Sequence, residues 1–150
     1  MKGDAPDTPA QLKARALRHL ARREHSRAEL ARKLAQHAES QEALAAVLDL
    51  LLAKKHQSDE RFAEERARSL SRKYGAAKIR QDLKSRGVAE DIVDRISAEG
   101  ECERAKSILA RKYRAPATTR EERAKRMRFL LGRGFSYEVI RGALSSGDDE

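Results

Sequence analysis

The chain has 150 residues, and its 33 Lys and Arg residues against 24 Asp and Glu residues give a net charge of +9 at pH 7. This length suits one domain or a short array of sub-domains. The single cysteine, Cys102, excludes an intrachain disulfide, and no apolar run is long enough for a membrane span or a signal peptide. We therefore expect a soluble, cytoplasmic protein that has no membrane partner.

A first three-helix repeat is predicted at residues 8–57, after a polar and disordered N-terminus at residues 1–7. The run Thr8-Pro9-Ala10-Gln11 is typical of a helix start, with Thr as N-cap, Pro in the first turn and Gln reaching back to the cap. Ser26-Arg27-Ala28-Glu29 is a second capping box, and Ser40 is placed to cap a third helix. Leucines follow each of these starts at helical spacing.

A second repeat is predicted at residues 58–98. Asp59 and Glu60 follow Ser58 and favour a helix start, because acids in a first turn interact well with the helix dipole. Gly75 then stands where Ser26 stood in the first repeat. The last predicted helix of this repeat carries apolar residues at Ile92, Val93 and Ile96.

A third repeat is predicted at residues 99–145, followed by an acidic tail at residues 146–150. Its first helix has an apolar stripe that runs from Cys102 to Tyr113. Thr119-Arg120-Glu121-Glu122 is another capping box, and the apolar residues from Val139 to Leu144 predict the last helix.

Two Arg-Gly steps support this division, because they recur at equivalent places. Arg86-Gly87-Val88 and Arg133-Gly134-Phe135 predict Schellman helix endings, each with its glycine in the left-handed conformation. The two glycines are 47 positions apart, a spacing typical of helical repeats. No segment alternates apolar and polar residues as a strand does. The prediction is an all-α fold of three tandem three-helix repeats, about nine helices, in an elongated, curved array.

Basic residues are segregated from acidic ones along the chain, which favours a basic face over evenly mixed ion pairs. Such a face most commonly binds a phosphate backbone, and phosphate contacts carry little base specificity. We therefore expect single- and double-stranded DNA as partners, bound with weak sequence specificity. The candidate binding residues face away from the apolar stripes: Arg22, Arg23, Arg27, Lys33, Arg72, Lys73, Lys78, Arg80, Lys84, Arg111, Lys112, Lys125, Arg126, Arg128 and Arg133.

Two tyrosines, Tyr74 and Tyr113, each follow an Arg-Lys pair. A ring beside phosphate-binding cations can stack on a base, but core packing at the end of an apolar stripe is the interpretation that we favour. Phe62, Phe129 and Phe135 lie in or beside apolar stripes, so they are predicted to be core residues.

Catalytic chemistry is not indicated by the sequence. The four histidines lack metal-ligand spacing, Cys102 has no histidine partner, and no Gly-Lys-Ser/Thr loop is present to cradle a nucleotide. We therefore predict no catalytic residue, no metal and no cofactor.

The order and spacing of these motifs resemble the RecX family of recombination regulators over residues 14–144. The resemblance rests on residues 23–30, 58–63, 73–75, 79–88, 112–113, 128–136 and 139–140. One departure is Lys55-His56-Gln57, where family members often carry a Gly and an aromatic or Leu residue.

The resemblance implies tandem three-helix repeats and a protein that binds the RecA protein and the RecA-DNA filament. We expect this protein to be a monomer and not an enzyme. It also implies inhibition of RecA's ATPase, strand-exchange and coprotease activities, and hence a role in DNA repair, DNA recombination and the SOS response. Two alternatives remain open from the residues alone. One is a helix-turn-helix-like regulator that reads DNA sequence, and the other is a scaffold whose basic face meets an acidic protein.

Overall fold

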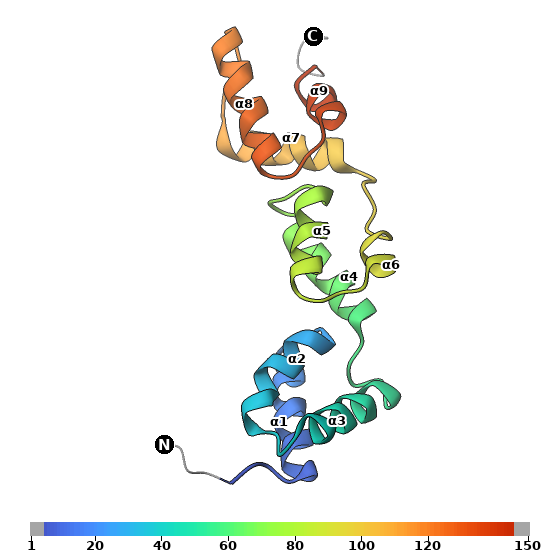
Figure 1. The fold of residues 1–150 in the computed structure, drawn as a ribbon. Coiled ribbons are helices and arrows are strands. Elements are labelled where there is room, and N and C mark those ends of the chain that lie inside the picture. Colours follow the sequence, from blue (N-terminus) through green and yellow to red (C-terminus); the bar gives the residue numbers. More distant parts are fainter. Residues whose placement is uncertain (1–4, 146–150) are drawn as a thin grey trace. The chain divides into compact units, whose positions relative to one another are not determined.

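The computed structural model describes residues 5–145, and within them the chain forms nine α-helices, one 3-10 helix and no strand (Figure 1). The predicted all-α fold is confirmed. Residues 1–4 of the predicted N-terminal segment and the whole acidic tail, residues 146–150, lie outside the described residues. The elements are α1 Pro9–Arg22, α2 Arg27–Leu34, η1 Ala35–His37, α3 Gln41–Ala53, α4 Asp59–Leu70, α5 Ala76–Ser85, α6 Glu90–Val93, α7 Glu101–Lys112, α8 Arg120–Gly132 and α9 Tyr137–Ser145.

The predicted helix starts are confirmed at Thr8, Ser26, Ser40 and Thr119, whose side chains each accept a hydrogen bond from the backbone N–H three residues on. Thr8 and Ser26 form complete capping boxes. At Thr119 the Glu122 carboxylate accepts the N–H of Thr118 (2.8 Å), one residue before the cap. The helix start is thereby fastened one residue further into the preceding loop.

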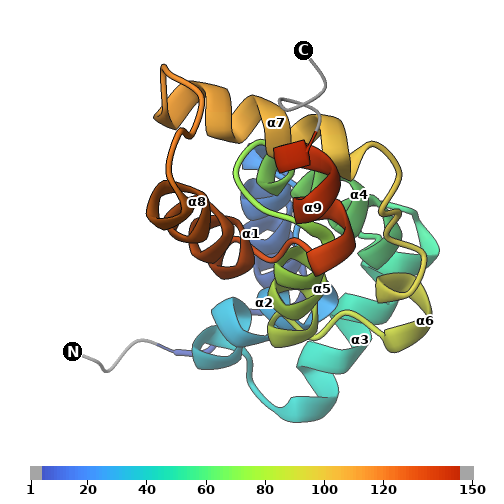
Figure 2. The ribbon, with the colours of Figure 1, turned by 90° about the horizontal axis from the view of Figure 1, so that it is seen from above.

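The chain divides into two compact units, and each has its own core. The first unit comprises residues 1–65 and 84–92, and the second comprises residues 66–83 and 93–150. In the first unit α1, α2 and α3 pack together, and in the second α9 packs against both α7 and α8 (Figures 1 and 2). The first core is built from Leu12, Ala16, Leu30, Leu34, Val47, Leu48 and Leu51, and the second from Ala105, Ile108, Leu109, Leu130, Phe135, Ile140 and Ala143.

Within the first unit, the start of α2 meets the turn that ends α5. The Ser26 hydroxyl donates to the carbonyl of Arg86 (2.8 Å), and the Arg27 N–H donates to the carboxylate of Asp59, the first residue of α4 (2.8 Å). Gln57 is buried beside them and donates to the carbonyl of His25 and to Asp59. We call this contact the first junction, and it gives the unusual Lys55-His56-Gln57 segment a structural role.

Within the second unit, the start of α5 meets the turn that ends α8, and here the donor to the turn is a backbone N–H in place of the serine hydroxyl. The Gly75 N–H donates to the carbonyl of Arg133 (2.7 Å), and the Ala76 N–H donates to the carboxylate of Glu101, the first residue of α7. We call this contact the second junction. In both junctions a helix start is therefore bonded to the carbonyl of an Arg-Gly turn and to the first acid of another helix.

Both glycines of these turns have the predicted left-handed conformation, with φ of 82° at Gly87 and 94° at Gly134. At Gly134 the Schellman pattern is complete, since Gly134 N–H donates to Leu131 (3.1 Å) and Phe135 N–H donates to Leu130 (3.2 Å). At Gly87 the bond from its N–H to Lys84 (3.0 Å) is formed.

One predicted helix is shorter than expected. Helix α6 ends at Val93, so Ile96 lies beyond it. The Arg80 guanidinium donates to the carbonyl of Ile96 (2.7 Å), which fixes this segment by a side-chain bond in place of further helical turns.

The second junction leaves no room for a side chain at Gly75, since a Cβ there would lie 2.5 Å from the carbonyl oxygen of Gly134. We expect Gly75→Ala to lower the free energy of unfolding by about 1–3 kcal/mol, because backbone would have to move. Gly132→Ala is the matched control, since its Cβ would meet nothing within 4 Å and alanine favours the helix by up to about 1 kcal/mol. Urea denaturation followed by circular dichroism measures the free energy of unfolding of both variants. Equal changes in the two variants would contradict the prediction.

Candidate nucleic-acid interface

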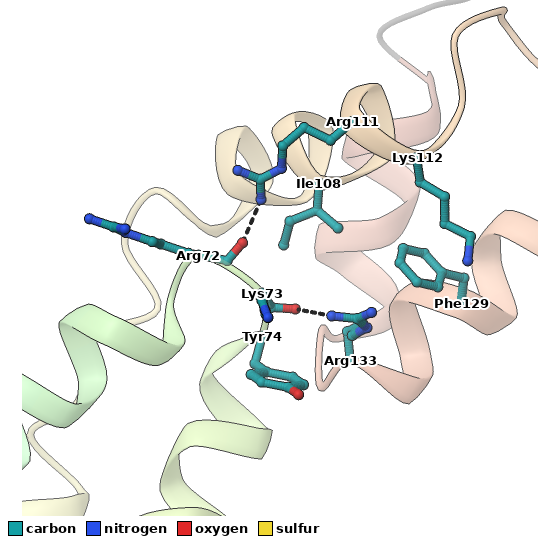
Figure 3. A pocket seen from close by; sticks show the side chains of 8 residues that line it. All are labelled: Arg72, Lys73, Tyr74, Ile108, Arg111, Lys112, Phe129 and Arg133. Carbon is teal, nitrogen blue, oxygen red and sulfur yellow. Dashed lines mark hydrogen bonds between the residues drawn. The ribbon is translucent and has the colours of Figure 1, made fainter.

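A basic groove of about 460 Å³ lies in the second unit (Figure 3). Its walls come from the segment after α4, from α7 and from α8. Five of its lining residues are cationic and none is acidic. The lining residues are Arg72, Lys73, Tyr74, Ile108, Arg111, Lys112, Phe129 and Arg133.

Two arginines in the groove are held by backbone carbonyls. The Arg111 guanidinium donates to the carbonyl of Arg72 (2.5 Å), and the Arg133 guanidinium donates to that of Lys73 (3.3 Å), as Figure 3 shows. In the same view the Arg72 side chain points away from Phe129, so this residue contributes its carbonyl to the groove. A neutral carbonyl orients a guanidinium without cancelling its charge. Over residues 5–145, no ion pair joins Arg111, Lys112 or Arg133 to a carboxylate.

Aromatic rings lie beneath these cations. The Lys112 ammonium is 4.4 Å from the ring centre of Phe129, and the Arg133 guanidinium is 4.9 Å from Phe129 and 5.4 Å from Tyr74. Such cation–π contacts stabilise a cation by about 0.5–1 kcal/mol where the site is exposed. The groove thus combines fixed positive charge with half-buried ring surface.

Three phenylalanines are predicted to be core residues, and the structure confirms this for two of them. Phe62 and Phe135 are buried, as predicted. The prediction for Phe129 is wrong in part, because the ring is half-buried and lines the groove. Tyr113 is also half-buried, packs edge-on against Phe129 and carries the Arg126 guanidinium 4.4 Å above its ring centre. Tyr74 lines the groove, which keeps base stacking open as a role for this residue.

Of the fifteen predicted binding residues, the groove brings together Arg72, Lys73, Arg111, Lys112 and Arg133. The others lie elsewhere. Lys78, Arg80, Lys125, Arg126 and Arg128 belong to the second unit without lining the groove, and Arg22, Arg23, Arg27, Lys33 and Lys84 belong to the first unit.

Several of these outlying cations have partners within the protein. Arg27 pairs with Asp49 (2.7 Å), Lys33 contacts the buried His25 (2.9 Å), and Arg126 donates to the carbonyl of Ala115 (2.8 Å). Burial lowers the pKa of His25, so its neutral form is favoured beside the Lys33 ammonium.

Arg23 takes part in a buried ion-pair cluster at the first junction. The Glu29 carboxylate, 6% exposed, accepts from Arg23 (3.1 Å) and from Arg86 (2.7 Å). Burial alone would raise the pKa of Glu29, but hydrogen bonds from Arg23, from the Ser26 backbone and from Arg86 lower it to about 2. Arg86 is not among the fifteen predicted binding residues, and its only signal in the sequence is its place in the Arg-Gly repeat.

These features define a class of helical-repeat protein that offers an open basic groove and no metal cluster among the residues searched for one. Models of the first, second and third three-helix domains of RecX match residues 13–51, 58–95 and 99–144. The chain belongs to the RecX family.

Similar proteins agree with this assignment. Regulatory protein RecX of Ralstonia nicotianae is 42% identical over 146 residues, which is 95% of this chain and 92% of that protein. Regulatory protein RecX of Herbaspirillum seropedicae is 42% identical over 144 residues, with 94% of each chain covered. The crystal structure of RecX from Lactobacillus salivarius shares the fold, with a TM-score of 0.82, 20% identity and coverage of 95% of this chain and 97% of that chain.

The Glu29 cluster predicts a specific loss of stability in acid. A carboxyl whose folded pKa is depressed stabilises the protein above its ordinary pKa of 4.5, and this contribution is lost as pH falls toward about 2. We expect about 3 kcal/mol of the free energy of unfolding to disappear over this window. Glu29→Gln should lower stability at pH 7 and remove that part of the acid dependence.

Urea denaturation at a series of pH values measures this effect, and Glu64→Gln, at an exposed site in the first unit, is the control. An acid dependence of Glu29→Gln equal to that of the control would contradict the predicted role of the cluster.

Proposed function

We propose that this protein is a non-enzymatic regulator that binds the RecA-DNA filament and inhibits RecA's ATPase, strand-exchange and coprotease activities. In this role it modulates DNA repair, recombination and the SOS response in the cytoplasm. The observation that carries the proposal is the match of all three RecX domain models in order along the chain, together with relatives named regulatory protein RecX.

The charge distribution supports a polyanionic partner. The net charge is +9, and the groove is lined by the cations Lys73, Arg111, Lys112 and Arg133 without an acid. Release of counterions from a phosphate backbone favours binding to such a surface at low salt. We propose that the fifteen basic residues predicted from sequence contact the filament, through its DNA, its protein or both. No helix within residues 5–145 is long and apolar enough to cross a membrane.

The test is single-strand-stimulated ATP hydrolysis by RecA, titrated with the purified protein. We expect inhibition below an equimolar ratio. Lys125→Glu/Arg128→Glu should raise the half-inhibitory concentration about tenfold, because reversing two exposed charges on α8 costs on the order of 1 kcal/mol of binding free energy.

Arg32→Glu/Lys54→Glu is the charge-matched control, since both residues are exposed and lie outside the proposed set. It should inhibit as the native protein does. Equal ATP turnover with and without the native protein at low salt would overturn the proposed function.

A further inference from the structure

The two junctions share one backbone arrangement but differ in charge at equivalent positions. Glu29 is the third residue of α2, and its equivalent in α5 is Lys78. Glu24 lies two residues before Ser26, and its equivalent before Gly75 is Lys73. Two acids of the first junction are therefore replaced by lysines in the second.

The same comparison applies to the Arg-Gly turns. Arg86 precedes Gly87 and pairs with Glu29, whereas Arg133 precedes Gly134 and has no ion pair with a carboxylate among residues 5–145. Five positions before each glycine stand Asp82 in the first case and Phe129 in the second. Asp82 is an acid that binds Arg66, but Phe129 presents a ring to Arg133.

The two junctions therefore differ in the groups that contact the positively charged arginine. In the first junction the anion is the buried carboxylate of Glu29. Glu24 is also paired there, with Arg61 (2.9 Å). In the second junction the protein supplies carbonyls and rings, which orient cations and do not neutralise them. Like charges held together by fixed bonds repel one another, and an external anion would relieve that repulsion.

We infer that the groove of the second junction binds a phosphodiester of single-stranded nucleic acid, with a neighbouring base stacked on Tyr74. The phosphate takes the role that the Glu29 carboxylate has in the first junction. Arg111, Lys112 and Arg133 face it, and Lys73 adds charge at the edge.

The aromatic floor favours a nucleic-acid strand over an acidic peptide. Bases stack on exposed rings, and Tyr74 and Phe129 provide half-buried ring surface beside the cations. A single strand has unstacked bases to offer, whereas a duplex keeps its bases inside.

This inference deepens the proposed function, since it assigns the DNA of a RecA-DNA filament to one groove. The first experiment therefore leaves RecA out. Binding of a fluorescent oligothymidylate is measured by anisotropy over a range of salt concentrations. The native protein is compared with Lys73→Gln/Lys112→Gln and with the charge-matched control Arg32→Gln/Lys54→Gln; all four lysine and arginine side chains are exposed.

We expect the groove variant to bind about tenfold more weakly and its salt slope to fall by about 1.4, which corresponds to two lost contacts with a single strand. The control should retain native affinity and slope. Equal losses in the two variants would mean that binding depends on net charge alone, and the inference would be overturned. Competition by polyglutamate as strong as that by oligothymidylate would overturn the nucleic-acid assignment.

A second series of variants tests whether a base stacks on Tyr74. Tyr74→Leu should weaken binding of oligothymidylate roughly tenfold while leaving binding of an abasic deoxyribose-phosphate strand unchanged, and Tyr74→Phe should retain native affinity. A merely structural role for Tyr74 would weaken both ligands equally, and that result would overturn the stacking contact.

The third test places an acid in the second junction, at the position that is equivalent to Glu29 in the first. The Lys78 ammonium bonds the carbonyl of Gly132 (3.2 Å) and lies 6.0 Å from the ring centre of Tyr74. Lys78→Glu should weaken oligonucleotide binding, because it places an acid beside Tyr74, and it should raise the melting temperature, because a carboxylate suits the first turn of α5. Lys54→Glu, with the same charge change, should do neither. Unchanged binding by Lys78→Glu would overturn the inference.

The RecA assay separates this inference from the proposed function. If the native protein fails to lower RecA's ATP turnover, the proposed function is overturned, and the oligonucleotide titrations still decide the groove. If RecA is inhibited but the groove variants bind oligothymidylate as the native protein does, only the groove assignment is overturned.

Discussion

The structure depends on the close approach of two backbones at each junction. A left-handed glycine turns the chain after α5 and again after α8, and the carbonyl before it accepts a bond from the start of α2 or α5. There is no space for a side chain at Gly75 or Gly134, where a Cβ would lie 2.5–2.6 Å from the facing atoms. In both junctions the arginine before the glycine therefore lies next to the start of a helix. Its guanidinium contacts a carboxylate in the first junction, and a carbonyl and aromatic rings in the second.

Each junction is held by one bond to the carbonyl of an Arg-Gly turn and by one bond from a helix-start N–H to an acid, so the other side chains around it can differ without changing the fold. In the first junction Glu29 is buried between Arg23 and Arg86, and removal of both arginines would leave an unpaired buried charge, which is costly. The second junction keeps its cations and covers ring surface with them. One framework thus supports a junction whose arginine is paired with a carboxylate and another whose arginine contacts a carbonyl and rings.

Features fixed by residues three or four positions apart could be predicted from sequence. The caps at Thr8 and Ser26 and the turn at Gly134 are of this kind, since each is satisfied within its own helix end. Features that join distant segments could not. Arg86 reaches Glu29 across 57 positions, and the groove needs Tyr74, Lys112 and Arg133 together. Phe129 shows the same limit, because its apolar spacing matches both a core position and the floor of a groove, and only the packing of α7 and α8 separates the two.

The choice of arginine at the groove follows from what holds it. A guanidinium has five N–H donors in a rigid plane, so one edge of Arg133 can bond a carbonyl while its face lies on a ring, and Arg111 can bond a carbonyl and still have further donors. An ammonium is not planar and cannot divide its contacts in this way. The contacts of the Lys112 ammonium within residues 5–145 are with the rings of Tyr113 and Phe129. Fixing the guanidinium groups before a ligand arrives also reduces the conformational entropy that binding would otherwise cost. The turn that requires glycine at position 134 therefore also places the Arg133 guanidinium against Tyr74, Phe129 and the carbonyl of Lys73.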